Sequence, residues 1–459
     1  ATLQGSARLR DWLLATAPDG TAVKARHGLL DEMPVAFADQ LALRARLTYE
    51  GRGKLDTRPL LAWMAAEGDS GVSGRYVATL AALCVITAVL FVLRQAAGIP
   101  PYFAISFVIY FGLSLTRLRS AVGVLNEAFT VQEMVSSLYG VFSYLERHSW
   151  ARQPQMQALT QPFHNADRPS RALRRLRLIV GAASLRNNYL VWGTLNAVMP
   201  WDMFTTYQMG QQRRKLARLL PGWVEVWAEL EALAALRLFA YLNPDYTRPI
   251  ITREGMVMAA RQLGHPLIDH GQRVCNDFVM DTTRVTMITG SNMSGKSSFL
   301  RTLGVNLVLA NAGAVVNAAE MQVSLFRVYT CIKVSDSLAD GFSYFYAEVR
   351  RLAQLLQALE KREDQPLFFL IDEIFKGTNN RERLLGSEAY IRALAGKHGT
   401  GAISTHDLEL ASLPDLANYH FADRVEDGQL RFDYRLREGV SPTTNALRIM
   451  MMAGLPIHE

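Results

Sequence analysis

Hydrophobic residues in the first part of the chain recur at three- and four-residue spacing, which is the period of amphipathic helices. The pattern is clearest over residues 131–145 and 223–242. Residues 1–74 show shorter helical stretches, because segments rich in glycine, proline and aspartate interrupt them. We therefore expect an N-terminal helical segment over 1–74 and a longer helical region over 119–260.

Two consecutive apolar segments lie between these regions. Residues 76–93 and 99–115 contain no charged side chain, and each is about as long as the roughly 17–25 residues that cross a bilayer. Their tandem arrangement predicts a transmembrane helical hairpin over 75–118, in contact with the lipid bilayer through 76–115. A pair of helices buried in a large helical core would also be uniformly apolar, and it is the alternative.

The charges around these segments predict an orientation. Arg75 precedes the first segment, Arg117 and Arg119 follow the second, and Arg94 alone lies in the connection. Basic residues prefer the cytoplasmic side of membrane spans. We therefore expect both ends of the hairpin, and the rest of the chain, on the cytoplasmic side of an inner membrane.

Beyond about residue 261 the pattern changes to short β-branched or aromatic runs that alternate with helical stretches. Such alternation predicts an α/β domain over 261–459, in which helices cover a mostly parallel sheet. The predicted strands are Val285–Thr289, Leu367–Ile371 and Gly401–Ser404, with less distinct ones near 419–422 and 430–436.

Composition narrows the class of protein. The chain of 459 residues is 49% hydrophobic and 20% charged, which excludes a disordered protein and suits about two to four domains. The three cysteines, Cys84, Cys275 and Cys331, are far apart in the sequence. This spacing argues against a disulfide scaffold or a zinc module and favours a reducing compartment.

The net charge of +7 is concentrated in the front part of the chain. Residues 1–260 contain 28 basic and 19 acidic residues, whereas the remainder contains 21 and 23. One helical stretch after Pro169 is especially basic, and a polyanion such as nucleic acid or anionic lipid would meet this part. The arginines of this stretch are Arg168, Arg171, Arg174, Arg175 and Arg177. They would also suit an ordinary solvated helix face.

Residues 290–297, GSNMSGKS, match the phosphate-loop pattern GxxxxGK[ST]. A predicted strand precedes the motif and an apolar helical stretch, 299–309, follows it, as the motif requires. The glycines let backbone N–H groups turn toward phosphate oxygens, and the N-terminus of the next helix adds partial positive charge. We expect Lys296 to reach the β- and γ-phosphates of ATP and Ser297 to bind Mg²⁺. The predicted nucleotide-binding residues of the loop are Gly290, Ser291, Asn292, Met293, Ser294, Gly295, Lys296, Ser297 and Ser298.

Acidic residues follow the next predicted strand. The apolar run 367–371 ends in Asp372 and Glu373, about 75 residues after the phosphate loop. At the carboxyl end of a strand beside that loop, Asp372 can hold Mg²⁺ and Glu373 can orient or deprotonate an attacking water. Two acids after an apolar run more often cap a helix, but the phosphate loop favours the catalytic role.

A histidine follows the third predicted strand. His406 comes two residues after the run 401–404. Since the carboxyl ends of parallel strands meet at one edge of a sheet, this imidazole can hydrogen-bond a γ-phosphate or the attacking water. We therefore count Glu373, His406 and Lys296 as the candidate catalytic residues.

With these motifs in place, residues 264–457 resemble the ATPase domain of the MutS family of DNA mismatch-repair proteins. Six stretches carry the resemblance and occur in the order of the family. They are GHPLI (264–268), ITGSNMSGKSSFLR (288–301), DSLADGFSYFYAEV (336–349), LIDEIFKGTN (370–379), STHDLEL (404–410) and FDYRLREGVSPTTNALRIMMMAGLP (432–456).

The resemblance implies an α/β ABC-type P-loop ATPase domain over 261–459, preceded by an all-α lever and core region over 119–260. It implies a dimer, in the simplest case a homodimer, that hydrolyses ATP between its two subunits and binds double-stranded DNA. It also implies roles for three further residues. Ser343 would reach the γ-phosphate in the opposite subunit, Asn292 would lie near the phosphates, and Asn276 would lie on the adenine side.

The sequence departs from the family pattern at two places. Ser294 stands where the family usually has a glycine, and FKGT over 375–378 replaces the usual Gly-Arg-Gly-Thr. No mismatch-reading front domain with its Phe-x-Glu wedge is recognisable. A second function therefore stays open, namely a membrane-anchored ATPase module that acts on a protein partner without DNA. A transporter half would carry an LSGGQ-type signature, which is absent, and a scaffold that only binds ATP would not need Glu373.

Overall fold

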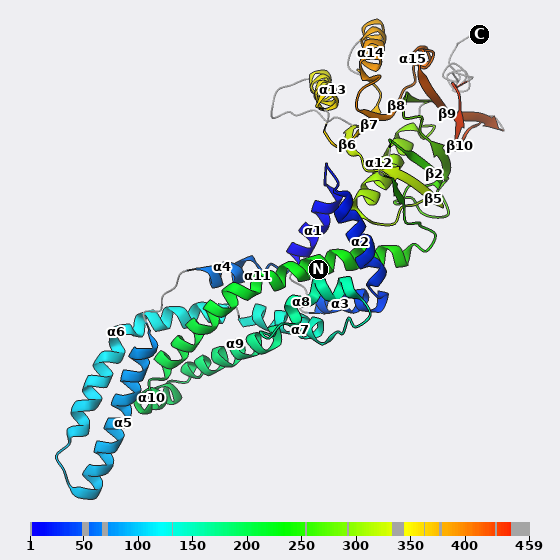
Figure 1. The fold of residues 1–459 in the computed structure, drawn as a ribbon. Coiled ribbons are helices and arrows are strands. Elements are labelled where there is room, and N and C mark those ends of the chain that lie inside the picture. The colour runs from blue at the N-terminus through cyan, green and yellow to red at the C-terminus, as the bar shows by residue number, and fades with distance from the viewer. Residues whose placement is uncertain are drawn as a thin grey trace. The chain divides into compact units, whose positions relative to one another are not determined.

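The computed structural model describes residues 2–47, 55–66, 72–130, 132–252, 255–291, 293–332, 344–361, 363–375, 379–426 and 429–441. The chain forms two compact units, which Figure 1 shows as ribbons. Unit 1 comprises Ala1–Leu9 and Glu32–Ala235, and unit 2 comprises Arg10–Asp31 and Leu236–Glu459. The division of the sequence into the segments 1–74, 75–118, 119–260 and 261–459 stays a prediction.

Unit 1 is helical throughout its described residues. Aromatic side chains form its centre: Phe142 contacts Phe163 edge-to-face with ring centroids 5.2 Å apart, and it contacts Trp227 at 5.6 Å. The helices are α1 (Leu3–Leu13), α3 (Val35–Leu47), α4 (Arg58–Ala65), α5 (Gly74–Ala97), α6 (Tyr102–Thr130), α7 (Gln132–Arg147), α8 (Pro154–His164), α9 (Pro169–Ala183), the 3₁₀ turn η1 (Ser184–Asn187), α10 (Tyr189–Val198) and α11 (Trp201–Leu242), of which α1 and α11 continue into unit 2.

Helices α5 and α6 lie side by side as a hairpin, which is drawn in blue and cyan in Figure 1. Ser73 caps the start of α5, and Gly98 ends it in a left-handed conformation. Both helices are long and apolar enough to cross a membrane, and only 11% and 17% of their apolar windows are buried. Among the described residues, therefore, no helical core covers most of the hairpin.

The hairpin satisfies its own polar groups. The hydroxyls of Thr87 and Ser106 share a hydrogen bond of 2.6 Å between the two helices. Tyr76 Oη donates to the carbonyl of Leu113 at 2.6 Å. Polar side chains on a helix pair in an apolar environment require such partners.

Unit 2 contains two sheets. One has the strand order β1-β5-β2-β3, and the other has the order β10-β9-β4-β8-β7-β6. In the larger sheet β9, β4, β8, β7 and β6 are parallel, and β10 is antiparallel to β9. The strands are β1 (Ile250–Thr252), β2 (Met258–Leu263), β3 (Asn276–Val279), β4 (Val285–Thr289), β5 (Glu320–Ser324), β6 (Arg327–Cys331), β7 (Leu367–Asp372), β8 (Gly399–Ser404), β9 (Leu416–Glu426) and β10 (Gln429–Glu438), and the helices are α2 (Gly20–Glu32), α12 (Lys296–Ala312), α13 (Tyr344–Glu360), α14 (Asn380–Leu394) and α15 (Leu408–Ala411).

Helices cover the larger sheet on both faces. Side chains of a strand alternate between the faces, so each strand contributes to the hydrophobic clusters on both sides. In β7, Phe368 and Leu370 belong to the cluster that contains the apolar side chains of α12. Phe369 and Ile371 belong to the other cluster, with residues of α13 and α14. The five strands predicted from the sequence are confirmed, and their parallel order brings the carboxyl ends of β4, β7 and β8 to one edge.

Candidate nucleotide-binding site

The predicted phosphate loop connects β4 to the first turn of α12. β4 is buried along its whole length, and α12 begins at Lys296. Gly290 and Gly295 adopt φ angles of 146° and 110°, which residues other than glycine rarely adopt. A methyl group on Gly290 would also lie 2.8 Å from the carbonyl oxygen of Phe421. Both glycines are therefore required for this path of the backbone.

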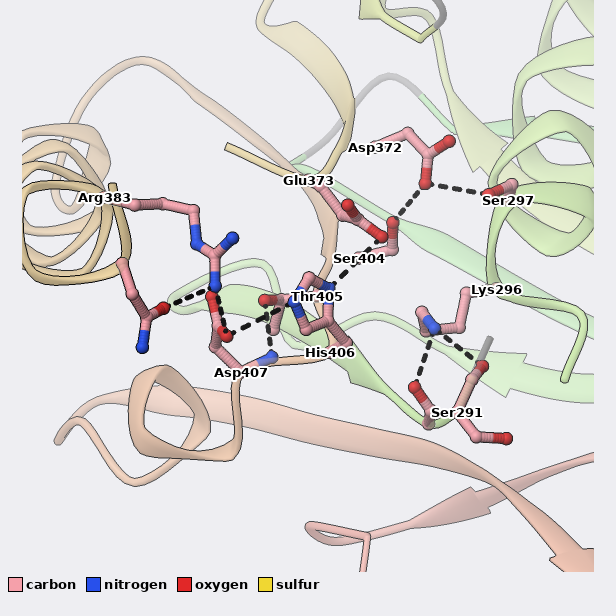
Figure 2. A network of polar contacts seen from close by, with 12 residues as sticks. Ser291, Lys296, Ser297, Asp372, Glu373, Arg383, Ser404, Thr405, His406 and Asp407 are labelled. Atoms are coloured by element: carbon pink, nitrogen blue, oxygen red, sulfur yellow. Dashed lines mark hydrogen bonds and ion pairs between the residues drawn. The ribbon is translucent and has the colours of Figure 1, made fainter. Parts of the chain in front are cut away.

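Lys296 points into the loop, as Figure 2 shows. Its ammonium donates hydrogen bonds to the carbonyl oxygens of Gly290 at 2.7 Å and Ser291 at 2.8 Å. Lys296 is only 5% exposed. A buried ammonium at the start of the helix that follows the loop is suited to bind phosphate oxygens.

Two loop hydroxyls support a phosphate ligand. The Oγ atoms of Ser291 and Ser294 are buried and have no hydrogen-bond partner among the described residues. Buried hydroxyls normally have a partner, since an unpaired one costs about 1–3 kcal/mol. Phosphate oxygens within the loop would supply it. Ser294, which departs from the family pattern, thus adds a hydrogen-bond donor to the loop.

Asp372 lies beside the loop at the end of β7. Its Oδ1 accepts hydrogen bonds from Ser297 Oγ at 2.9 Å and from Ser404 Oγ at 2.6 Å. The carboxylate is 8% exposed. The two residues predicted to hold Mg²⁺ are thus brought together from positions 75 residues apart. Hydroxyl and carboxylate oxygens fit this ion, which usually takes one or two protein ligands and completes its shell with phosphates and water.

Glu373 follows Asp372 with a strained backbone. Its φ is +63°, and its N–H donates to the carbonyl of Ser404 at 3.0 Å. Its carboxylate forms an ion pair with His406, with 3.4 Å between Oε1 and Nδ1. Two of the three candidate catalytic residues, Glu373 and His406, are therefore neighbours at the carboxyl ends of β7 and β8 (Figure 2).

His406 is held between two carboxylates. Its Nε2 lies 3.5 Å from Oδ1 of Asp407, which in turn accepts a hydrogen bond of 3.0 Å from Arg383. The hydrogen bond with Glu373 raises the pKa of His406, and the charges of Asp407 and Glu373 act in the same direction. The imidazole is therefore set to share a proton with Glu373.

Sequence reasoning missed Glu348 on α13. Its side chain is buried, and Oε1 accepts a hydrogen bond of 2.7 Å from the backbone N–H of Phe375. Phe375 has a φ of +55°. Glu348 therefore fixes the segment that follows Glu373. Glu348 belongs to the stretch DSLADGFSYFYAEV, which resembles the MutS family, and this stretch could have identified it as a site residue.

A cavity of about 380 Å³ adjoins the phosphate loop. Its volume and its mixed lining suit a nucleoside. Tyr434 lines the cavity from β10, where the strand register shifts between Phe432 and Leu436 and Tyr434 has a φ of +54°. The lining residues include Leu263, His265, Ile268, Gly295, Ser298 and Phe299.

Asn276 also lines this cavity, but its amide is engaged with β10. Nδ2 donates to the carbonyl of Tyr434 at 3.0 Å, and Oδ1 accepts from the N–H of Leu436 at 2.8 Å. Asn276 thereby holds the bulge that positions Tyr434. Tyr434 was not predicted as a site residue, because a bulge leaves no mark in the hydrophobic pattern; the stretch 432–456, which contains it, was the available signal.

Two predicted site residues, Asn292 and Ser343, lie outside the described residues. Met293, at the tip of the loop, has a φ of +69° and a largely exposed side chain. Among the residues that the structure does describe, no group of three His, Cys, Asp or Glu side chains could hold a metal ion. A Mg²⁺ site here would therefore depend on Ser297, Asp372 and the nucleotide itself.

Comparison with known proteins gives a match to the same part of the chain. Residues 286–458 match the family model of MutS domain V. The DNA mismatch repair protein MutS 2 of Halobacterium salinarum is 34% identical over 255 residues, which is 53% of this chain and 29% of that protein. The DNA mismatch repair protein MutS of Thermus thermophilus is 33% identical over 250 residues, which is 54% of this chain and 30% of that protein. The chain thus spans about three-tenths of the length of these relatives.

The ion pair between Glu373 and His406 predicts a pH dependence. Because the pKa of folded His406 is raised above its ordinary 6.5, the pair stabilises the fold fully below that pH, and this contribution is lost as pH rises through the raised pKa. In a histidine-selective NMR titration we expect His406 to titrate above 6.5, and Glu373→Gln to lower its pKa. Glu409→Gln, which removes an exposed carboxylate nearby, is the matched control. An unaltered titration in Glu373→Gln would contradict the pairing.

Proposed function

Because this chain belongs to the MutS family, whose domain V it contains in residues 286–458, we propose that it is a dimeric switch driven by Mg²⁺-dependent ATP hydrolysis. The observation that carries the proposal is the hydrogen bond between Ser297 and Asp372, 2.9 Å long, beside the loop that holds Lys296. It supports a single site for the phosphates and for the ion that neutralises them. The parallel order of β4, β8 and β7 is consistent with an ABC-type P-loop domain.

Each residue has a role that follows from its position. Lys296 and the hydroxyls of Ser291 and Ser294 bind phosphate oxygens, while Tyr434 lines the cavity that takes the base. Ser297 and Asp372 would hold Mg²⁺, which neutralises charge on the β- and γ-phosphates. Both are oxygen ligands of the kind the ion prefers.

Glu373 acts on the attacking water. Glu373 directly follows Asp372, the last residue of β7, which contacts Ser297 of the phosphate loop. The contact of Glu373 with His406 provides a second group that can take up the proton that the carboxylate accepts. His406 therefore orients the carboxylate and relays the proton. Both groups need to be near the γ-phosphate when ATP is bound.

A homodimer completes the site in this proposal. Each ATP would lie between two ATPase domains, and Ser343 of the second copy would contact the γ-phosphate. The support for a dimer is the similarity of this chain to MutS proteins. Hydrolysis would then open the pair and reset the switch.

Double-stranded DNA is the proposed ligand of the helical region. The relatives bear the name DNA mismatch repair protein, and helix α9 presents exposed arginines. Arg171, Arg174 and Arg175 fall on one face, whereas Arg168 at the start of the helix lies 3.6 Å from Glu146. The spacing of the exposed three suits contacts to successive phosphates.

ATP hydrolysis is tested with single variants of the full chain. We expect Lys296→Ala to lose ATP binding, and Glu373→Gln to bind ATP but release phosphate about 10²–10⁴-fold more slowly, because the water loses its base. Filter binding and phosphate release measure the two effects. Glu409→Gln should behave like the unaltered chain. Hydrolysis at the ordinary rate in either site variant would reject the assignment of the site.

DNA binding is tested by its salt dependence. Each phosphate contact contributes a slope of about 0.9 to the fall of log affinity with log salt. We expect Arg171→Ala, Arg174→Ala and Arg175→Ala together to reduce this slope by up to about 3, measured by fluorescence anisotropy of duplex DNA between about 50 and 200 mM salt.

The control for DNA binding removes the same charge elsewhere. Arg284, Arg381 and Arg392 are exposed arginines of unit 2, and their joint replacement by alanine should leave the slope unchanged. If both triple variants behave alike, or if the unaltered chain shows no salt-sensitive binding, DNA is not the ligand of α9.

A membrane anchor is the second function that a specific observation favours. The hairpin of α5 and α6 exposes large apolar side chains along its length, including Val89 on α5 and Val108 on α6. We propose that it spans a bilayer through residues 76–115, with the ATPase domain on the cytoplasmic side. The switch could then act on DNA, or on a protein partner in a membrane-anchored module that does not recognise DNA.

Flotation with liposomes tests the anchor. A charge at the centre of a membrane helix costs about 2.5–3.5 kcal/mol. The full chain should float with the vesicles, and the double variant Val89→Lys and Val108→Lys should stay at the bottom of the gradient. Leu14→Lys, which alters an equally exposed apolar residue of unit 2, should float. Flotation of the double variant would exclude the spanning hairpin.

A further inference from the structure

A third uncharged segment lies outside the hairpin. Residues 187–201 contain no charged side chain and are bounded by Arg186 and Asp202. The segment contains α10 (Tyr189–Val198), a helix of 10 residues, which at 1.5 Å per residue is about 15 Å long. A helix of this length is too short to cross a bilayer but long enough to lie within one leaflet.

The surface of α10 is apolar and uncovered. Tyr189 and Leu190 are each 84% exposed, and Val198 is 69% exposed. Val191 and Ala197 are exposed as well, so apolar side chains face outward at several angles around the helix. A helix that docks on a protein presents one apolar face and keeps polar residues on the others. An apolar surface around most of the helix instead fits a lipid environment.

Contacts within unit 1 place α10 at the level of the hairpin. Tyr110 Oη on α6 donates a hydrogen bond to the carbonyl of Asn196 on α10. Tyr110 lies six residues, or about 9 Å, inside the apolar segment when counted from Thr116. The face of α6 between Phe107 and Leu118 forms a largely apolar cavity of about 270 Å³ with α10. If the hairpin spans the bilayer, α10 therefore lies at the depth of the adjoining leaflet.

Three polar side chains of α10, those of Trp192, Thr194 and Asn196, form hydrogen bonds within unit 1, which suits a lipid environment. Trp192 Nε1 donates a hydrogen bond of 2.8 Å to Oδ2 of the buried Asp202. The backbone N–H of Asp202 in turn donates to Asn196 Oδ1 at 3.1 Å. Thr194 Oγ1 donates to the carbonyl of Leu190 at 2.8 Å. Asn188 caps the start of the helix by accepting from two backbone N–H groups.

We propose that α10 is a half-inserted membrane helix that lies in the cytoplasmic leaflet and contacts lipid acyl chains. The proposal rests on the membrane-spanning hairpin proposed above and deepens it, because it makes the membrane contact a unit of three helices. The cavity between α6 and α10 is open to the same acyl chains. Arg186, directly before the uncharged segment, lies where a basic residue meets lipid headgroups.

The test uses the full chain in liposomes with an environment-sensitive fluorophore at single cysteines. Cys84, Cys275 and Cys331 are first replaced by serine, and ATPase activity verifies the fold. The label is then introduced at Leu190→Cys and Val198→Cys on α10. Val89→Cys marks the hairpin and Leu14→Cys marks an exposed position of unit 2. Nitroxide lipids carry the quencher either near the headgroup or near the end of the acyl chain.

We expect both α10 labels to emit at shorter wavelength and to lose fluorescence with the quencher near the headgroup. The Val89 label should lose more fluorescence with the deep quencher, and the Leu14 label should respond to neither. If the Val89 label is quenched while both α10 labels are not, α10 is outside the bilayer and only the hairpin stands. If the α10 labels emit at shorter wavelength but are not quenched by either lipid, a second copy or another protein covers α10, and the proposal is overturned. If the Val89 label itself is not quenched, the hairpin proposal fails, and this proposal fails with it.

Discussion

The candidate site depends on one buried carboxylate. Asp372 Oδ1 accepts hydrogen bonds from Ser297 at the start of α12 and from Ser404 at the end of β8, so a single atom ties together three segments that are remote in sequence. A carboxylate that is 8% exposed is costly to keep charged unless donors or a cation compensate it. Two hydroxyls provide part of this compensation. A divalent cation beside the phosphate loop would provide the rest, and so the same interaction builds the fold and prepares the metal site.

The backbone after Asp372 is strained, and this conformation directs the side chains of Asp372 and Glu373 toward different neighbours. Glu373 and Phe375 both have positive φ angles, a conformation that costs of order 1–3 kcal/mol per residue and persists only where surrounding contacts enforce it. The enforcing contacts are the bond from Glu373 N–H to Ser404 and the bond from Phe375 N–H to Glu348. As a result Asp372 faces Ser297 while Glu373 faces His406. The two adjacent carboxylates thus have different neighbours, and in the proposed function one would face the cation and the other the proton.

The sequence predicted the parts of unit 2 that are buried on both faces. β4 and β7 appear as continuous apolar runs, so their ends and the acids after them could be located in advance. The smaller sheet was missed, because β2 and β5 mix buried and exposed positions and so do not appear as continuous apolar runs. Glu348 was missed because a glutamate in an amphipathic helix normally faces water, and Tyr434 because its position depends on a bulge. Asn276 was expected on the adenine side, and it does line the cavity, but its amide bonds to β10.

The bilayer proposed above would account for the distribution of charge around three stretches of unit 1. Three stretches, 76–93, 99–115 and 187–201, contain no charged residue, and an arginine stands next to each, as Arg75, Arg94, Arg117 and Arg186 do. A helical bundle in water needs apolar residues only on its inward faces, since exposed faces are stabilised by solvated charges. Here the exposed faces of α5, α6 and α10 carry apolar residues as well. Water gives no reason for excluding charge from an exposed surface, whereas a hydrocarbon layer does, because each charge within it costs several kcal/mol. The bonds between Thr87 and Ser106 and between Trp192 and Asp202 fit the same layer, since they leave these polar groups paired inside the unit.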